Sequence, residues 1–364
     1  MTDQEYHHDK IVVQRLLATL RVSPKNIKYN EQQELIELDL SELDLREVPL
    51  EVIQLHNLQK LSLAWNRLTL IPEEINQLQQ LQLLSLEGNQ LLSIPDTLGQ
   101  LHNLCVLILS WNQFLSLPES IGQLHNLQEL LLTGNRLIEL PITITQTRKL
   151  RKLSLEANRL IALPSAIGLL NNLEELSLAW NQLTSLPSAI GHLINLRQLF
   201  LSKNHLAMVP SELGRLHQLQ KLSLSWNILT SLPAEFGNLL NLRQFSLIGN
   251  QLTSLPHEIG HLIHLEEFLL TGNQLTSLPI EIGHLRNLRE LALYGNRLTS
   301  LPVEMQELHN LRELSLDNNQ LTSIPIEMGQ LKQLQQLSIS GNPLTSMPEE
   351  FTRLSKQRQF SGDE

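Results

Sequence analysis

The segment from Leu173 to Asn195, LEELSLAWNQLTSLPSAIGHLIN, contains the pattern that decides the fold. Leu176 and Leu178 are two residues apart, which places both side chains on one face of a short strand. After Asn181 the apolar spacing lengthens to three or four residues, which indicates a turn followed by a helical or 3-10 segment. A unit of this size cannot bury its apolar face alone, so the segment predicts stacking against neighbouring copies of itself.

Copies of this segment recur with a fixed period along most of the 364-residue chain. Asparagine stands at every 23rd position from Asn66 to Asn342, and proline at every 23rd position from Pro49 to Pro348. Two residue types that share one period and one offset define a repeat lattice. The lattice predicts an N-terminal helical cap over residues 1–34, fourteen 23-residue repeats over residues 35–356, and a frayed C-terminal tail over residues 357–364.

Stacked units of this kind predict an α/β solenoid, in which the strands form a parallel sheet and the leucines form a continuous core. The amide of each repeated asparagine is expected to hydrogen-bond backbone groups of the turns and so to link successive units in a ladder. In the fifth unit Thr145 and Thr147 replace the usual glycine and leucine. We expect looser packing there, on the side opposite the strands.

The exposed ends of a solenoid require polar caps, and the first residues provide a candidate. Residues 9–21 read DKIVVQRLLATLR and predict a helix with Asp9 as its N-cap. The apolar residues near one helical stripe are Ile11, Val12, Leu16 and Leu20. A membrane-surface helix is the alternative, but such a helix would have a more basic polar face.

The motif LxxLxLxxNxL, present here as LEELSLAWNQL, resembles the leucine-rich-repeat family. The following LPxxIGxL resembles the subgroup of intracellular Ras-associated scaffolds, and similar 23-residue arrays occur in effectors of intracellular bacterial pathogens. The resemblance covers 322 of 364 residues and implies a horseshoe with a concave parallel β-sheet and short helical or 3-10 convex segments. It also implies a protein partner, such as a small GTPase or a ubiquitin-pathway protein.

The composition excludes several other classes of function. With 27 Lys and Arg against 37 Asp and Glu, the formal net charge is −10, which is unsuited to nucleic-acid phosphates. A single cysteine excludes an internal disulfide and a cysteine-based zinc site. No apolar run is long enough to span a membrane, and the start MTDQEYHHDK lacks the order of a secretory signal. We expect a monomer without cofactor or resident metal, either cytoplasmic or, if it comes from an intracellular bacterium, translocated into the cytosol of a host cell.

The position just before each repeated asparagine is the most informative variable position. It holds glycine in six units and tryptophan in four, and those four are the only tryptophans of the chain: Trp65, Trp111, Trp180 and Trp226. Exposed tryptophan is frequent among the residues that dominate binding energy in interfaces. We therefore predict a binding role on the concave rim. Two alternatives remain open: each ring shields the backbone of its neighbours, or repeat duplication has carried the residues along.

The strongest local cluster lies around Trp180 and Trp226, which are expected to be roughly 10 Å apart across Lys203 because adjacent strands are ~4.8 Å apart. Phe200 and His205 belong to the same repeat as Lys203. This combination of aromatic rings with one cation suits an acidic or aromatic side chain of a partner.

Two further apolar patches and a charge pattern are expected on the outward strand positions. The first patch comprises Leu83, Val106, Ile108, Trp111 and Leu131, and the second comprises Ile248, Leu269 and Tyr294. Contiguous apolar patches of this kind indicate contact surfaces. Charges alternate in sign from repeat to repeat, for example Arg151 and Lys152 followed by Glu174 and Glu175, and predict cross-strand ion pairs.

One segment, His257-Glu258-Ile259-Gly260-His261, matches the H-E-x-x-H pattern of zinc proteases. That chemistry requires a helix long enough to place both histidines on one metal, whereas here the segment follows Pro256 and fits the repeat consensus. A metal-dependent hydrolase at this segment is thus only a remote alternative. Cys105 lacks an evident base and is expected to be a bystander. We expect a non-enzymatic scaffold that binds a protein through its concave face, with a structural or self-associating array as the alternative.

Overall fold

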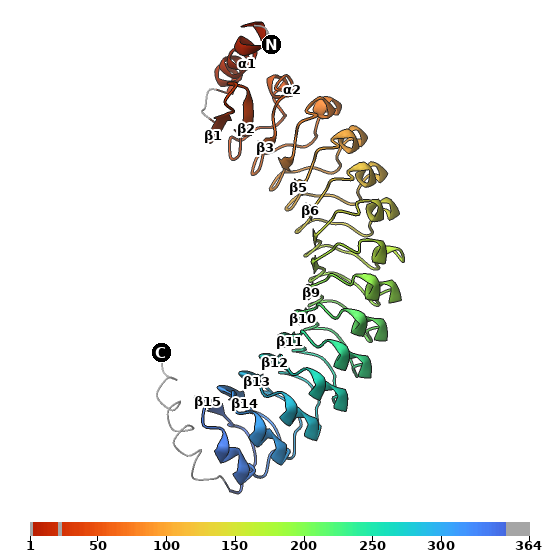
Figure 1. Ribbon diagram of the computed structural model, residues 1–364, viewed down its shortest axis with the longest axis vertical. Helices are drawn as coiled ribbons and strands as arrows, with labels where there is room; N and C mark the ends of the chain where they lie inside the picture. The colour runs from red at the N-terminus through yellow and green to blue at the C-terminus, as the bar shows by residue number, and fades with distance from the viewer. Residues whose placement is uncertain (1–2, 21–23, 347–364) are drawn as a thin grey trace. The chain divides into compact units, whose positions relative to one another are not determined.

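The computed structural model describes residues 3–20 and 24–346, and the chain divides into two compact units, Met1–Gln182 and Leu183–Glu364. In each unit the strands line one side and short 3-10 turns line the opposite side (Figure 1). The predicted C-terminal tail and the last ten residues of the predicted repeat array lie outside the described residues. The division into a cap and fourteen repeats therefore stays a prediction.

The first unit contains a sheet whose strands follow one another in chain order. Its strands are β1 (Asn26–Tyr29), β2 (Leu35–Asp39), β3 (Lys60–Ser62), β4 (Leu83–Ser85), β5 (Val106–Ile108), β6 (Glu129–Leu131), β7 (Lys152–Ser154) and β8 (Glu175–Ser177). β1 pairs antiparallel with β2, and all later neighbours up to β8 pair parallel. Its helical segments are α1 (Asp3–Leu20), α2 (Leu50–Ile53), η1 (Glu73–Gln77), η2 (Asp96–Gln100), η3 (Glu119–Gln123), η4 (Ile142–Gln146) and η5 (Ile167–Leu169).

The second unit repeats the same arrangement with parallel neighbours throughout. Its strands are β9 (Gln198–Phe200), β10 (Lys221–Ser223), β11 (Gln244–Ser246), β12 (Glu267–Leu269), β13 (Glu290–Ala292), β14 (Glu313–Ser315) and β15 (Gln336–Ser338). Its 3-10 helices are η6 (Ser188–His192), η7 (Ser211–Arg215), η8 (Ala234–Asn238), η9 (His257–His261), η10 (Ile280–His284), η11 (Val303–Glu307) and η12 (Ile326–Gln330). Of the helices in the described ranges, none has the length and apolarity needed to cross a bilayer.

The local geometry follows from the repeat residues. Each three-residue strand turns its middle residue inward, as Leu84 and Leu107 do, and both are fully buried. The repeated proline precedes the 3-10 turn in an extended conformation; Pro95, for example, has φ −68° and ψ 149°. Because the proline ring fixes φ near this value and has no N–H, it directs the chain from the extended stretch into the turn. The predicted solenoid class is confirmed within each unit.

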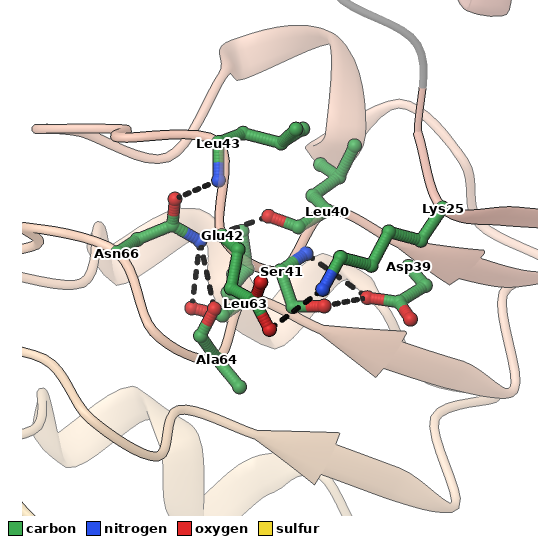
Figure 2. Close-up of polar contacts among 9 residues, drawn as sticks. All are labelled: Lys25, Asp39, Leu40, Ser41, Glu42, Leu43, Leu63, Ala64 and Asn66. Atoms are coloured by element: carbon green, nitrogen blue, oxygen red, sulfur yellow. Dashed lines mark hydrogen bonds and ion pairs between the residues drawn. The ribbon is translucent and has the colours of Figure 1, made fainter.

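The repeated asparagine forms the expected ladder, and Figure 2 shows its first step. The side-chain amide of Asn66 donates to the carbonyl of Leu63 in its own turn at 3.0 Å and to that of Leu40 in the preceding repeat at 2.8 Å. Its carbonyl oxygen accepts the N–H groups of Leu43 and Leu45, each at 3.0 Å. Each asparagine thereby satisfies buried backbone groups of two repeats at once, so its exchange removes hydrogen bonds from both repeats.

The N-terminal segment differs from the expectation in two respects. Asp9 is not an N-cap, because α1 begins at Asp3; its buried carboxylate instead accepts the N–H of Leu35, the first residue of β2, at 2.8 Å. Ile11 is exposed, whereas Val12, Val13 and Leu16 are buried, so the buried stripe is shifted from the predicted one. The side chain of Leu20 lies outside the described part. The antiparallel pairing of β1 with β2, which the repeat pattern does not predict, continues the sheet beyond the first parallel strand.

The side opposite the strands changes at the boundary between the fifth unit and the next repeat, while the two threonines of the fifth unit are themselves well packed. Thr145 and Thr147 are buried, and their hydroxyls donate to the carbonyls of Ile142 and Ile144 at 2.8 and 2.6 Å. η4 keeps five residues, as η3 does, whereas η5 in the following repeat is shortened to three. The threonines are accommodated because each hydroxyl finds an acceptor within its own turn.

Candidate functional site

The residue before each repeated asparagine adopts the left-handed backbone conformation in both units. The non-glycine residues at this position have φ between 53° and 58° and are Trp65, Trp111, Ala157, Trp180, Lys203, Trp226 and Asn318. The six glycines there have φ between 65° and 71°. Glu42 has the same conformation before Leu43, which takes the place of the asparagine in the first repeat. A side chain in this conformation costs roughly 1–2 kcal/mol. The repeat pattern marks the position as variable, and the glycines that recur there were the available signal for its backbone strain, which was not predicted.

Three tryptophans lie over the glycine at the same position of the next repeat. A Cβ atom added to Gly134 would lie 2.6 Å from Cε3 of Trp111, and one added to Gly249 would lie 2.6 Å from Cε3 of Trp226; Trp65 covers Gly88 in the same way. This is the packing role that the sequence left open as an alternative. The indoles nevertheless remain just over half exposed. Their binding role stays a prediction.

The predicted cluster around Lys203 is divided between the units, because Trp180 belongs to the first unit and Phe200, Lys203, His205 and Trp226 belong to the second. Within the second unit the Lys203 ammonium lies 4.8 Å from the centre of the Trp226 ring. Phe200 is half-buried at the end of β9, and His205 is exposed. The cation–π contact expected with a partner is thus already made inside the chain, and the 10 Å spacing of the two tryptophans stays a prediction.

The patch in the first unit is brought together by strand register. Val106 is the register neighbour of Leu83, and Ile108 is the register neighbour of Leu131. All four side chains are half-buried on the outward side, and Trp111 follows β5 with an exposed ring. We call these five residues the strand patch. The rows are polar on either side, with Ser85 and Ser154 flanking Ile108 and Leu131, and Lys60 and Glu129 flanking Leu83 and Val106. The strand patch is therefore a local departure from a polar face.

The patch expected in the second unit is not continuous. Leu269 has Ser246 and Ala292 as its register neighbours, so no other large apolar residue adjoins it in its row. Tyr294 is 44% exposed, and its hydroxyl accepts a hydrogen bond from the amide of Asn318 at 3.0 Å. Ile248 is half-buried.

The expected cross-strand ion pairs are confirmed in both units. Arg151 Nε lies 2.8 Å from Glu174 Oε1, and Lys152 Nζ lies 3.0 Å from Glu175 Oε1. In the second unit the carboxylate of Glu266 is shared by two arginines, Arg243 at 2.6 Å and Arg289 at 2.9 Å. Such exposed pairs contribute little stability but neutralise much of the charge on this face.

One row of like charges in the second unit was not predicted, because the charge pattern along the sequence alternates in sign. Glu267, Glu290 and Glu313 are register neighbours on β12, β13 and β14. Partial burial, together with the charges of Glu313 and Glu267, raises the pKa of Glu290 above its ordinary value. The three glutamates are 23 residues apart in the sequence, so the repeat period together with a parallel register could have predicted that they are neighbours.

The His257–His261 segment has the wrong helix geometry for the zinc-protease motif. It forms the five-residue 3-10 helix η9. With three residues per turn, positions i and i+4 are roughly 120° apart around the axis, so the two histidines do not share a face. His257 Nε2 instead lies 3.1 Å from Glu258 Oε1. Within the described ranges no group of three or more His, Cys, Asp or Glu side chains is arranged to hold a metal ion.

Comparison with family models finds leucine-rich repeats in several parts of the chain. Residues 234–340 match the model of a leucine-rich repeat region, and residues 148–206 match a leucine rich repeat model. Single-repeat matches cover residues 57–78, 80–101, 218–239 and 333–354. No curated protein sequence matches the chain.

Solved structures extend the similarity over most of the chain. A leucine-rich repeat protein of Leptospira interrogans is 40% identical, with a TM-score of 0.70 over 88% of this chain and 93% of that chain. The chain belongs to the leucine-rich repeat family. A plant peptide hormone receptor, RGFR1 in complex with RGF2, is 30% identical with a TM-score of 0.69 over 87% of this chain and 60% of that chain. An internalin of Listeria monocytogenes, at 23% identity, shares the fold with a TM-score of 0.73 over 94% of this chain and 92% of that chain.

Proposed function

We propose that this protein is a non-enzymatic scaffold that binds a protein partner through the strand face of its first unit. The observation that carries the proposal is the strand patch, in which two pairs of apolar register neighbours interrupt polar rows. Ile108 and Leu131 stand between Ser85 and Ser154, and Leu83 and Val106 stand between Lys60 and Glu129. Apolar side chains clustered on an otherwise polar face cost solubility and indicate a contact surface. The rigid sheet presents them with little loss of conformational entropy on binding.

The comparisons support a binding role in general terms. Leucine-rich repeat proteins are typically binding scaffolds, and the plant receptor with RGF2 is one example of a structural neighbour in complex with a ligand. We extend the proposal to an effector that acts on host signalling or ubiquitin pathways, with a small GTPase or a ubiquitin-pathway protein as partner, in the cytoplasm or in the cytosol of a host cell. The similarity to a Leptospira protein supports a bacterial setting for this extension.

A pair of substitutions within the strand patch tests the proposal. Ile108→Ser with Leu131→Ser introduces the residue that neighbouring strands carry at the same register, so the fold should be retained. Proteins captured from cell lysate by the wild type would be identified by mass spectrometry, purified and titrated against both forms by calorimetry. We expect the double variant to weaken binding by about tenfold or more, the effect of losing ~1.4 kcal/mol.

A control substitution changes one outward-facing apolar residue of the second unit. Leu269→Ser removes a half-buried, outward-facing apolar side chain outside the strand patch and should leave the same affinity unchanged. Equal affinity of the wild type and the patch variant would contradict the proposal. Self-association that depends on the strand patch, measured by sedimentation, would instead support the structural array.

A further inference from the structure

A second exposed apolar row occurs on the flank of the first unit, away from the strands. The third residue after the repeated asparagine is threonine in most repeats of the second unit, as in Thr253, Thr276 and Thr299. In four successive repeats of the first unit the position holds a large aliphatic residue instead. These residues, which we call the edge ridge, are 59%, 52%, 47% and 54% exposed, and they are Leu92, Leu115, Ile138 and Ile161.

Backbone hydrogen bonds place the members of the edge ridge side by side. The N–H of Ile138 donates to the carbonyl of Leu115 at 3.4 Å, and the N–H of Ile161 donates to the carbonyl of Ile138 at 3.3 Å. The N–H of Gln113, two residues before Leu115, donates to the carbonyl of Leu91 at 2.9 Å, which sets the same register one repeat earlier. The four side chains therefore form one contiguous row across neighbouring repeats.

The fold does not require aliphatic residues at this position. In the second unit threonines make the same backbone ladder. The N–H of Thr276 donates to the carbonyl of Thr253, and the N–H of Thr299 donates to the carbonyl of Thr276, each at 3.4 Å. Half-exposed leucine and isoleucine contribute little to the core there. A contiguous row of them is the kind of surface that marks a contact site.

Two cations adjoin the edge ridge and define the chemistry of its occupant. Arg136 and Arg159 precede Ile138 and Ile161 by two residues, so in the extended segments they point to the same side. Both are exposed, and in the part of the chain that the structure describes neither makes a side-chain hydrogen bond or an ion pair. Glu139 is exposed beside Ile138, so these flanking charges sum to one positive charge.

We propose that the edge ridge docks an amphipathic helix of a protein partner whose apolar stripe is bordered by acidic side chains. The row has one side chain per repeat at a spacing of ~4.8 Å, close to the ~5.4 Å rise of one helical turn. Acidic residues beside the stripe would pair with Arg136 and Arg159 and steer association. A second copy of this chain fits less well, because a two-fold contact would bring the same arginines together. This surface is separate from the strand face of the proposed function.

The test uses the full chain and two synthetic helical peptides labelled with fluorescein. Both carry one leucine per turn, and they differ only in having glutamate or lysine beside the leucines. Fluorescence anisotropy should show that the acidic peptide binds about tenfold more tightly than the basic one at low salt. The triple variant Leu115→Thr, Ile138→Thr, Ile161→Thr should bind the acidic peptide about tenfold more weakly, or weaker still. The double variant Arg136→Gln, Arg159→Gln should bind the acidic and basic peptides equally well. Its affinity for the acidic peptide should depend less on salt concentration than that of the wild type.

Two controls separate the edge ridge from general stickiness and from misfolding. Ile280→Thr removes another exposed aliphatic residue, in the second unit, and should leave peptide binding unchanged. Unaltered circular dichroism and urea midpoints would show that the variants fold. The proposal is overturned if the acidic peptide does not bind, if the triple variant binds it as the wild type does, or if both peptides bind equally. It is also overturned if the edge ridge drives self-association, or if vesicles containing phosphatidylserine bind through it while the acidic peptide does not.

Discussion

In the first unit the outward positions of β4 to β6 carry the apolar strand patch, whereas in the second unit the outward row of β12 to β14 carries Glu267, Glu290 and Glu313. The flanks differ in the same direction, since the edge ridge of the first unit is replaced by threonines in the second. The asparagine ladder and the leucine core are alike in both units. The repeat therefore fixes the framework, and the two units differ where side chains meet solvent.

The largest effect should fall on the framework, and it should be equal in the two units. Asn135→Ala leaves the N–H of Phe114 unpaired and removes one of the two asparagine donors from each of the carbonyls of Leu109 and Leu132. Asn273→Ala does the same to the N–H of Leu252 and to the carbonyls of Leu247 and Leu270. We expect each to cost about 3 kcal/mol, because one buried N–H loses its acceptor and two buried carbonyls each lose a hydrogen bond. Urea unfolding would measure the loss. Asn126→Ala, at an exposed position, is the control and should cost much less. A unit that tolerates its substitution would break the claim of a common framework.

The next effect distinguishes the units at the left-handed position. Gly134→Ala would place a Cβ 2.6 Å from the Trp111 ring, whereas Gly272→Ala would place one 3.7 Å from the Cα of Gly249. Both pay the conformational cost of about 1 kcal/mol, and Gly134→Ala should cost about 1 kcal/mol more for moving the ring. Urea midpoints of the two variants would show the difference. Adding Trp111→Ala to Gly134→Ala should remove the excess, and its persistence would argue against the ring as the cause.

A smaller effect concerns the carboxylate row of the second unit. The pKa of Glu290 is raised, so the folded chain holds this proton more tightly than the unfolded chain, and stability falls as the pH rises through the folded value. Glu290→Gln should therefore raise the urea midpoint modestly at pH 7. The gain should vanish below the ordinary value of 4.5.

Glu129→Gln in the first unit is the matched control for the carboxylate row. Its register neighbours are Val106 and Lys152, so it removes no like-charge contact and should not raise the midpoint at pH 7. A pH-independent gain in Glu290→Gln would show that repulsion within the carboxylate row is not its source.

The smallest effect is expected at the flank. Ile138→Thr and Thr276→Ile exchange the residues of the two units at equivalent solvent-facing positions. Each should change the free energy of unfolding by no more than about 0.5 kcal/mol, because little buried area changes. Thermal and urea unfolding would measure both. A loss of several kcal/mol in Ile138→Thr would mean that the edge ridge serves packing and would undermine its assignment as a docking surface.

The framework was predictable because it repeats. The asparagine series that begins at Asn66 and the proline series that includes Pro72 share one period, which defines the repeat. The parallel register then places Ile108 beside Leu131. What does not repeat was predicted less well: Asp9 bonds Leu35 across 26 residues, a contact that helix-capping rules do not anticipate. The left-handed conformation at Trp111 was missed because tryptophan rarely adopts it, although glycine at Gly134 in the next repeat indicated it.

The central claim, that the first unit binds a partner through its strand face, is tested most directly by site-specific photo-crosslinking. A benzoylphenylalanine would replace Leu131 on β6 in one form and Ala292, which has the corresponding place on β13 of the second unit, in another. Each form would be irradiated with the purified partner captured by the wild type. The account predicts a crosslinked product from position 131 and none from position 292. A product from position 292 alone, or from neither position while the partner remains bound, would contradict it.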